Sequence, residues 1–230
     1  MSIADKLQTV AENQQRVYQA GEQEGYEKGV AEYQWVQYSQ SLFGMFENVT
    51  FPENTEITLK MPNFLNRMDS AFRAAKNLKK ITLVCENWQS NAYGAQASQA
   101  FATMTTGLEV IDLSNFKVIY GYVNHMFSSN YSMREIIGEL DFSLSTNNST
   151  FLSGCSALEE IRFVAGCLKV NTNFSPCSKL SSDSIQSIID GLADLTGQTA
   201  QTLTFHKDVA AKLTQAQMDA ISAKNWTLVY

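Results

Sequence analysis

The hydrophobic positions of this chain recur in a pattern that begins at a phenylalanine. In residues 151–163, FLSGCSALEEIRF, Phe151 is followed by Leu158, by Ile161 and by a further apolar residue at the end. Residues 101–113 repeat this order, and residues 72–83 repeat it with one residue fewer. The phenylalanines that begin the units are 29, 26, 24 and 23 residues apart: Phe72, Phe101, Phe127, Phe151 and Phe174.

The end of each unit predicts a β-strand. Apolar residues that alternate with polar ones at a period of two lie on one face of a strand. This alternation predicts strands at 57–61, 81–83, 111–113, 161–163, 202–205 and 227–230. Between phenylalanine and leucine, each unit is short and rich in Ser, Ala, Gly and Cys, which is enough for about one turn. Residues 86–100 and 120–125 are interpreted as insertions that bulge from the array.

A single unit of this kind cannot bury its apolar face. Stacked units can, because parallel strands about 4.8 Å apart would bring the Phe, Leu and Ile positions into one continuous interior. The sequence therefore predicts an α/β solenoid of parallel strands, with roughly seven rungs.

The C-terminal part has a different pattern, which predicts a cap on the solenoid. Residues 181–192 place apolar side chains on one face of a helix, with Ser181 or Ser182 as the N-cap. Thr214 and Gln217 form a capping-box pattern that begins a second helix. We therefore expect three segments: an N-terminal helical segment at 1–42, the solenoid at 43–180, and a C-terminal cap at 181–230.

The N-terminal segment contains a weak heptad. Ile3, Leu7, Val10 and Val17 occur at spacings of three, four and seven residues. One interpretation is a coiled-coil helix that joins copies of the chain or docks it on a larger assembly. The other is an amphipathic helix that lies over the first rung, and the pattern leaves both open.

The repeat units resemble those of BspA-type leucine-rich-repeat proteins. The closest segment is S153-G-C-S-A-L-E-E-I-R-F163, and the resemblance covers about residues 46–230. The opening MSIADKL, residues 184–205 and the closing AKNWTLVY look like proteins encoded by phages and prophages of gut Firmicutes. The resemblance implies a leucine-rich-repeat stack and a virion or tail-associated role in host recognition, and it supplies no catalytic residues.

Composition and motifs give little support for chemistry. The net charge of −6 argues against a nucleic-acid partner, and no apolar stretch is long enough to span a membrane or to form a secretory signal. We expect no enzyme, no cofactor and no metal site, since the sequence contains no recognisable catalytic or zinc-binding motif. The four cysteines are interpreted as buried free thiols, with a disulfide among the last three as the alternative: Cys85, Cys155, Cys167 and Cys177.

Aromatic residues in the expected insertions and loops suggest a binding surface. Tyrosine and tryptophan with Asn and Ser between them are typical of protein contact surfaces, although such side chains also fill gaps between uneven rungs. The candidate binding residues are Trp88, Tyr93, Tyr120, Tyr122 and Tyr131.

These observations lead to a functional hypothesis. We expect a non-enzymatic binding or structural protein of a phage particle, made in the bacterial cytoplasm. Its expected partners are a protein or glycan on a host surface, other virion proteins, and further copies of itself through the N-terminal helix. The alternative is a bacterial surface adhesin.

Overall fold

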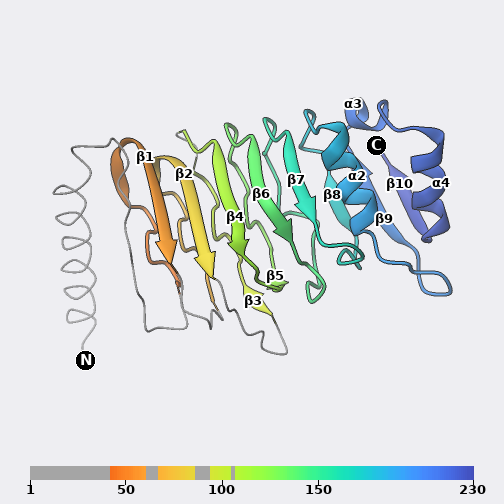
Figure 1. Cartoon of the computed structure of the whole chain (residues 1–230), viewed down its shortest axis with the longest axis horizontal. Coiled ribbons are helices and arrows are strands. Elements are labelled where there is room, and N and C mark those ends of the chain that lie inside the picture. Colours follow the sequence, from red (N-terminus) through yellow and green to blue (C-terminus); the bar gives the residue numbers. More distant parts are fainter. Residues whose placement is uncertain (1–41, 61–66, 86–93, 105–106) are drawn as a thin grey trace.

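The computed structural model describes residues 42–60, 67–85, 94–104 and 107–230. In these ranges the chain forms ten strands and three helices, shown in Figure 1. In chain order the described elements are β1 (Thr50–Lys60), β2 (Lys76–Cys85), β3 (Ala95–Gln96), β4 (Val110–Phe116), β5 (Tyr120–Tyr122), β6 (Glu135–Leu140), β7 (Glu160–Phe163), β8 (Thr172–Phe174), α2 (Ser182–Gly191), β9 (Gln201–Phe205), α3 (Lys207–Ala210), α4 (Gln215–Ala223) and β10 (Trp226–Val229). The predicted heptad residues Ile3, Leu7, Val10 and Val17 lie outside the described residues.

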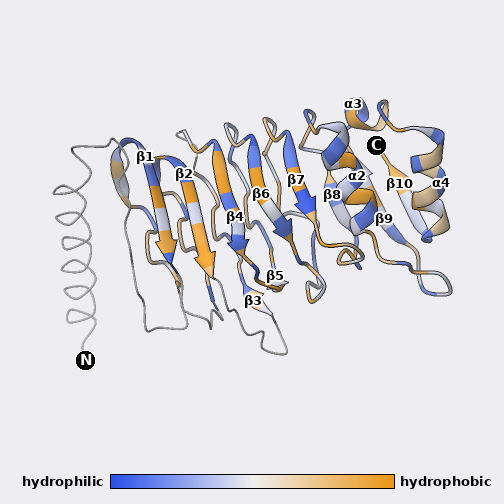
Figure 2. Ribbon diagram, viewed as in Figure 1, coloured by the Kyte–Doolittle hydropathy of each residue, from blue (hydrophilic) through white to orange (hydrophobic). Residues whose placement is uncertain are grey.

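The largest sheet is parallel and has five strands in the order β1-β2-β4-β6-β7 (Figure 1). The isoleucines of successive repeat units are in register across it, with Ile57 beside Ile81, Ile81 beside Ile111, and Ile111 beside Ile136. Hydrophobic and hydrophilic residues alternate along its strands (Figure 2). This alternation places the isoleucines in the core and the intervening side chains on the opposite, outward face.

The turns that carry the repeated phenylalanines also stack on one another. The N–H of Phe72 donates to the carbonyl of Ala100 at 2.7 Å, and the N–H of Phe101 donates to the carbonyl of Met126 at 2.8 Å. The rings of Phe72 and Phe101 are nearly parallel, with centroids 5.5 Å apart. The buried apolar residues form one cluster from Leu42 onward. The prediction that the Phe, Leu and Ile positions share one interior is therefore confirmed.

The turns owe their shape to residues in the left-handed backbone region. Ser70 and Ala74, which flank Phe72 at two residues on either side, have φ angles of 53° and 55°. Gln99 and Thr103 flank Phe101 in the same way, with φ angles of 55° and 56°. A residue with a positive φ cannot continue a right-handed helix, because that helix requires a φ of about −60°. These segments therefore form turns in place of the helical connections that an α/β chain would have.

The predicted fold class, an α/β solenoid built as a leucine-rich-repeat stack, is wrong. The described residues form mostly parallel β-sheet, and their three helices all follow residue 181. The strands also do not continue as a single stack of rungs. They divide into the central five-stranded sheet, a three-stranded sheet in the order β10-β9-β8, and a two-stranded sheet of β3 and β5.

Helix α2 explains why the five-stranded sheet ends at β7. The hydroxyl of Ser184 accepts a hydrogen bond from the N–H of Ile161, and the hydroxyl of Ser187 accepts one from the N–H of Phe163, both at 3.0 Å. Backbone donors that a sixth strand would have satisfied are thus satisfied by side chains of a helix. The sheet stops there, and a new one begins beyond it.

The C-terminal predictions agree with the structure. Ser181 is the N-cap of α2, and Thr214 and Gln217 form a complete capping box at the start of α4. The strands expected at 202–205 and 227–230 are β9 and β10. The insertion expected at 120–125 is different, because residues 120–122 form β5, which pairs in parallel with β3.

Candidate binding surface

The outward face of the five-stranded sheet carries side chains that are partly or fully exposed. Each strand buries one set of side chains and presents the alternate set to this face. The outward residues are Glu56, Thr58 and Lys60 of β1, Lys80, Thr82 and Val84 of β2, Val110 and Asp112 of β4, Glu135, Ile137 and Glu139 of β6, and Glu160 and Arg162 of β7. Most of these residues are polar or charged, so the face is suited to contact with a polar partner.

Only part of the charge on this face is balanced within it. The ammonium of Lys80 pairs with the Asp112 carboxylate at 3.2 Å. Partial burial raises the pKa of Asp112, but hydrogen bonds from the Ser114 hydroxyl and N–H, together with Lys80, lower it below its ordinary value. Glu135 and Glu160 lie directly beside one another in the β6–β7 register. Like charges in adjacent positions of a sheet are destabilising, so this pair of glutamates is unfavourable for the stability of the sheet.

A groove opens in this face because β4 and β6 separate along part of their length. The strands pair from Val110 to Asp112, and the chains next meet where Ile119 bridges Asp141. Between these links the β4 side has six residues, 113–118, and the β6 side has three, 138–140. The surplus residues must leave the plane of the sheet, as in a β-bulge. The resulting groove has a volume of about 590 Å³, within the usual range for ligand sites.

Gly138 allows the two chains to approach closely at the groove. Its φ angle is +96°, and a Cβ atom there would lie 2.7 Å from the carbonyl carbon and oxygen of Leu113. A side chain at this position would meet backbone atoms and would also strain the backbone. The sequence therefore needs glycine here for the groove to have this shape.

The groove combines apolar walls with charged groups. Neither the Glu139 nor the Asp141 carboxylate takes part in the four ion pairs formed among the described residues. One oxygen of Asp141 accepts the N–H of Ser143 at 2.9 Å. The lining residues are Leu113, Val118, Ile119 and Val164, which are apolar, with Gly138, Ser114, Lys117, Glu139 and Asp141.

The structure places the predicted aromatic residues in three different situations. Trp88 and Tyr93 lie outside the described residues. Tyr120 is 1% exposed, so its ring lies in the core and does not contribute to an exposed surface. Tyr122 and Tyr131 are 38% and 56% exposed and are accessible to a partner.

Tyr120 has a further property. Its ring meets Phe142 edge-on, with centroids 5.7 Å apart, and its hydroxyl has no hydrogen-bond partner among the described residues. Burial raises the pKa of this hydroxyl far above its ordinary range. The group is therefore neutral at all ordinary pH values, and its unpaired hydroxyl is an energetic cost to the fold.

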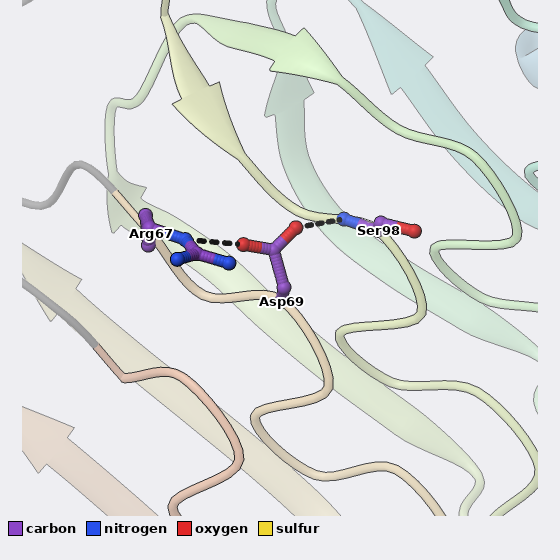
Figure 3. Close-up of polar contacts among 3 residues, drawn as sticks. All are labelled: Arg67, Asp69 and Ser98. Carbon is purple, nitrogen blue, oxygen red and sulfur yellow. Dashed lines mark hydrogen bonds and ion pairs between the residues drawn. The ribbon is translucent and has the colours of Figure 1, made fainter.

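A second polar cluster lies at the edge formed by the stacked turns (Figure 3). The Arg67 guanidinium contacts one oxygen of Asp69 at 3.0 Å, and the N–H of Ser98 donates to the other oxygen at 3.2 Å. Both oxygens of the Asp69 carboxylate are thus occupied by groups of the same chain. This cluster joins neighbouring turns, because Asp69 and Ser98 belong to different repeat units.

The four cysteines are buried, and none of them forms a disulfide bond among the described residues, as the favoured interpretation of their spacing proposed. The thiol of Cys155 donates to the carbonyl of Phe127 at 3.0 Å, and burial raises its pKa to about 12. Burial likewise raises the pKa of Cys167 to about 11. Neutral, buried thiols of this kind are poor nucleophiles and poor metal ligands.

The described ranges lack two larger features. They contain no group of three or more His, Cys, Asp or Glu side chains that could hold a metal ion. No helix within them is both long enough and apolar enough to cross a membrane.

Comparison of the chain with protein-family models, with curated proteins and with solved structures finds no match.

The groove between β4 and β6 was not anticipated from the sequence. Gly138, a glycine that follows the apolar pair Ile136 and Ile137, was a local signal of an irregular strand.

Proposed function

We propose that this protein is a non-enzymatic binding protein that recognises a partner through the outward face of its five-stranded sheet. The observation that carries the proposal is the in-register pair Glu135 and Glu160 on that face. Glu160 gains one hydrogen bond from the Ser184 hydroxyl, at 3.1 Å, whereas Glu135 takes part in none of the four ion pairs formed among the described residues. Natural sequences break local preferences of this kind mainly at functional sites.

The scaffold beneath the face supports the same proposal. Backbone hydrogen bonds join the strands on one side of the core and the turns on the other side. Stacked phenylalanine rings fill the space between them. The backbone of such a framework loses little conformational freedom on binding, which favours affinity.

For the biological setting, we propose a phage particle in which the protein contacts a host-surface protein or glycan. The support is the resemblance of the terminal segments to proteins encoded by phages and prophages. The presence of the chain in purified particles, measured by mass spectrometry, tests this part. Detection on the bacterial surface but not in particles would favour the adhesin.

A binding experiment tests the role of the sheet face. The purified protein is applied to arrays of bacterial glycans and surface proteins, alongside Glu135→Lys and Glu53→Lys. Glu53 is exposed on β1, and its substitution changes the net charge by the same amount. We expect an array ligand that loses at least about ten-fold in affinity with Glu135→Lys and keeps its affinity with Glu53→Lys. Equal binding by the two variants would contradict the proposal.

A further inference from the structure

We infer that the groove between β4 and β6 receives a lysine or arginine side chain of the partner. The inference rests on the proposed function and specifies the chemistry of one position on the sheet face. It follows from the shape of the groove, from the apolar character of its walls and from the charge of its rim.

The walls of the groove suit the aliphatic stem of a long cationic side chain. Val118, Ile119 and Val164 line it, and its volume of about 590 Å³ exceeds that of any single side chain. Lysine and arginine place their methylene groups along apolar surface while the charged group reaches polar partners. A short side chain would leave these walls in contact with water.

The charged groups of the groove favour a cation over an anion. Glu139 and Asp141 contribute two carboxylates, and Lys117 contributes one ammonium group. Arg162 is the register neighbour of Glu139, but the two form no ion pair among the described residues. The lining residues of the groove therefore carry two negative charges and one positive charge, and an incoming ammonium or guanidinium would find two carboxylates that take part in no ion pair among the described residues.

Other occupants fit less well. A neutral apolar side chain would cover the carboxylates without offering them a hydrogen-bond donor, which is unfavourable. A sugar ring would be expected to stack on an aromatic side chain, and the described lining of the groove contains none. An acidic side chain would face two like charges against one opposite charge.

Short peptides that differ at one position provide a direct test. Acetylated and amidated pentapeptides of sequence Gly-Gly-X-Gly-Gly, where X is lysine, arginine, norleucine or glutamate, are titrated into the full chain. Binding is followed by the NMR shifts of the backbone amides of Ser114 and Gly138. We expect saturable shifts with lysine and arginine, smaller shifts with norleucine, and none with glutamate.

Two matched variants locate the effect. The side chain of Glu139 is exposed, so Glu139→Gln is expected to fold normally. It should weaken the lysine peptide about five-fold, which corresponds to about 1 kcal/mol. Glu53→Gln changes the net charge equally at an exposed site on β1 and should leave the affinity unchanged. Equal effects of the two variants, or equal binding of the lysine and glutamate peptides, would overturn the inference.

The outcome can be separated from that of the proposed function. An array ligand that is lost with Glu135→Lys but bound equally by Glu139→Gln would support the sheet face and overturn the groove. Selective binding of the lysine peptide with no array ligand sensitive to Glu135→Lys would support the groove chemistry and overturn the proposed function.

Discussion

The junction between α2 and β7 offers the sharpest test of how this fold is held together. Ser184 is completely buried, and its hydroxyl accepts the N–H of Ile161 at 3.0 Å. It also contacts the carbonyl of Glu159 at 3.0 Å, but that carbonyl accepts a second hydrogen bond, from the N–H of Ser181. Substitution of Ser184 by alanine therefore leaves one buried donor, the N–H of Ile161, without its partner. It also removes the hydroxyl that lies 3.1 Å from the Glu160 carboxylate, but that carboxylate is partly exposed and water can replace the bond.

The magnitude follows from this count. A buried donor left without a partner costs about 1–3 kcal/mol. Alanine is a better helix former than serine and recovers about 0.5 kcal/mol. We therefore expect Ser184→Ala to lower the free energy of unfolding by about 1–2 kcal/mol. For a chain of this size the midpoint of thermal unfolding should fall by about 2–8 °C.

Urea denaturation and amide hydrogen exchange measure the two parts of this prediction. Ser184→Ala should accelerate hydrogen exchange at the amide of Ile161 more than at the amide of Ile136, which is paired within the sheet. Ser182→Ala is the control, because Ser182 is exposed near the start of the same helix, and it should change stability by less than about 0.5 kcal/mol. If Ser184→Ala were as neutral as this control, with Ile161 still protected, the proposed role of α2 in ending the sheet would be refuted.

Three further substitutions test other features of the structure. Tyr120→Phe should raise the free energy of unfolding, measured by urea denaturation, by about 1–2 kcal/mol, because it removes a buried hydroxyl that has no partner among the described residues. A lower free energy of unfolding would show that the hydroxyl is hydrogen-bonded. Gly138→Ala should lower the free energy of unfolding by about 1–3 kcal/mol, because the new Cβ would meet the Leu113 carbonyl and the φ angle is positive. An unchanged free energy of unfolding would show that the backbone at this position can relax. Asp112→Asn should destabilise the protein at pH 7, where the lowered pKa of the wild-type carboxyl contributes stability. As the pH falls below 3.8 that contribution is lost, so the stability curves of Asp112→Asn and wild type should converge, and a constant difference would show that folding does not lower the pKa of this carboxyl.

The hydrophobic pattern was sufficient to locate most of the strands. Ile81 and Ile111 were assigned to strand faces from their alternation, and both are buried in register in the central sheet. The signal for the start of α4 was also local, because the capping box uses only residues 214–217. Such features can be predicted because each depends on neighbours within a few positions along the chain.

The same pattern could not show what connects the strands. Ala74 and Thr103 adopt left-handed backbone angles although neither residue favours them. Their conformation is stabilised by hydrogen bonds to the next turn, such as the one from Ala74 N–H to the carbonyl of Ala102. The sequence predicted only that each connection is about one turn long, and the stacking that shapes these turns involves residues almost thirty positions apart.

The exposure of the candidate binding residues also depends on tertiary structure. Tyr122 and Tyr131 are exposed, whereas Tyr120, only two residues before Tyr122, is buried. Residues two positions apart share a face of a regular strand, but the β3–β5 pairing is irregular between Tyr120 and Tyr122, and sequence composition does not report that irregularity. The groove depends on a mismatch between the lengths of two chain segments that become neighbours only after folding.

The sequence by itself determined the recurring Phe, Leu and Ile positions, the strands that end the repeat units and the caps of the C-terminal helices, since these follow from periodicity and short-range hydrogen bonding. Tertiary structure alone decided that the strands divide into separate sheets at α2 and that β4 and β6 part to form a groove. In both cases the deciding interaction joins backbone groups to partners more than twenty residues away, such as Ile161 with Ser184 and Ile119 with Asp141. Such partners are fixed by the packing of the whole core.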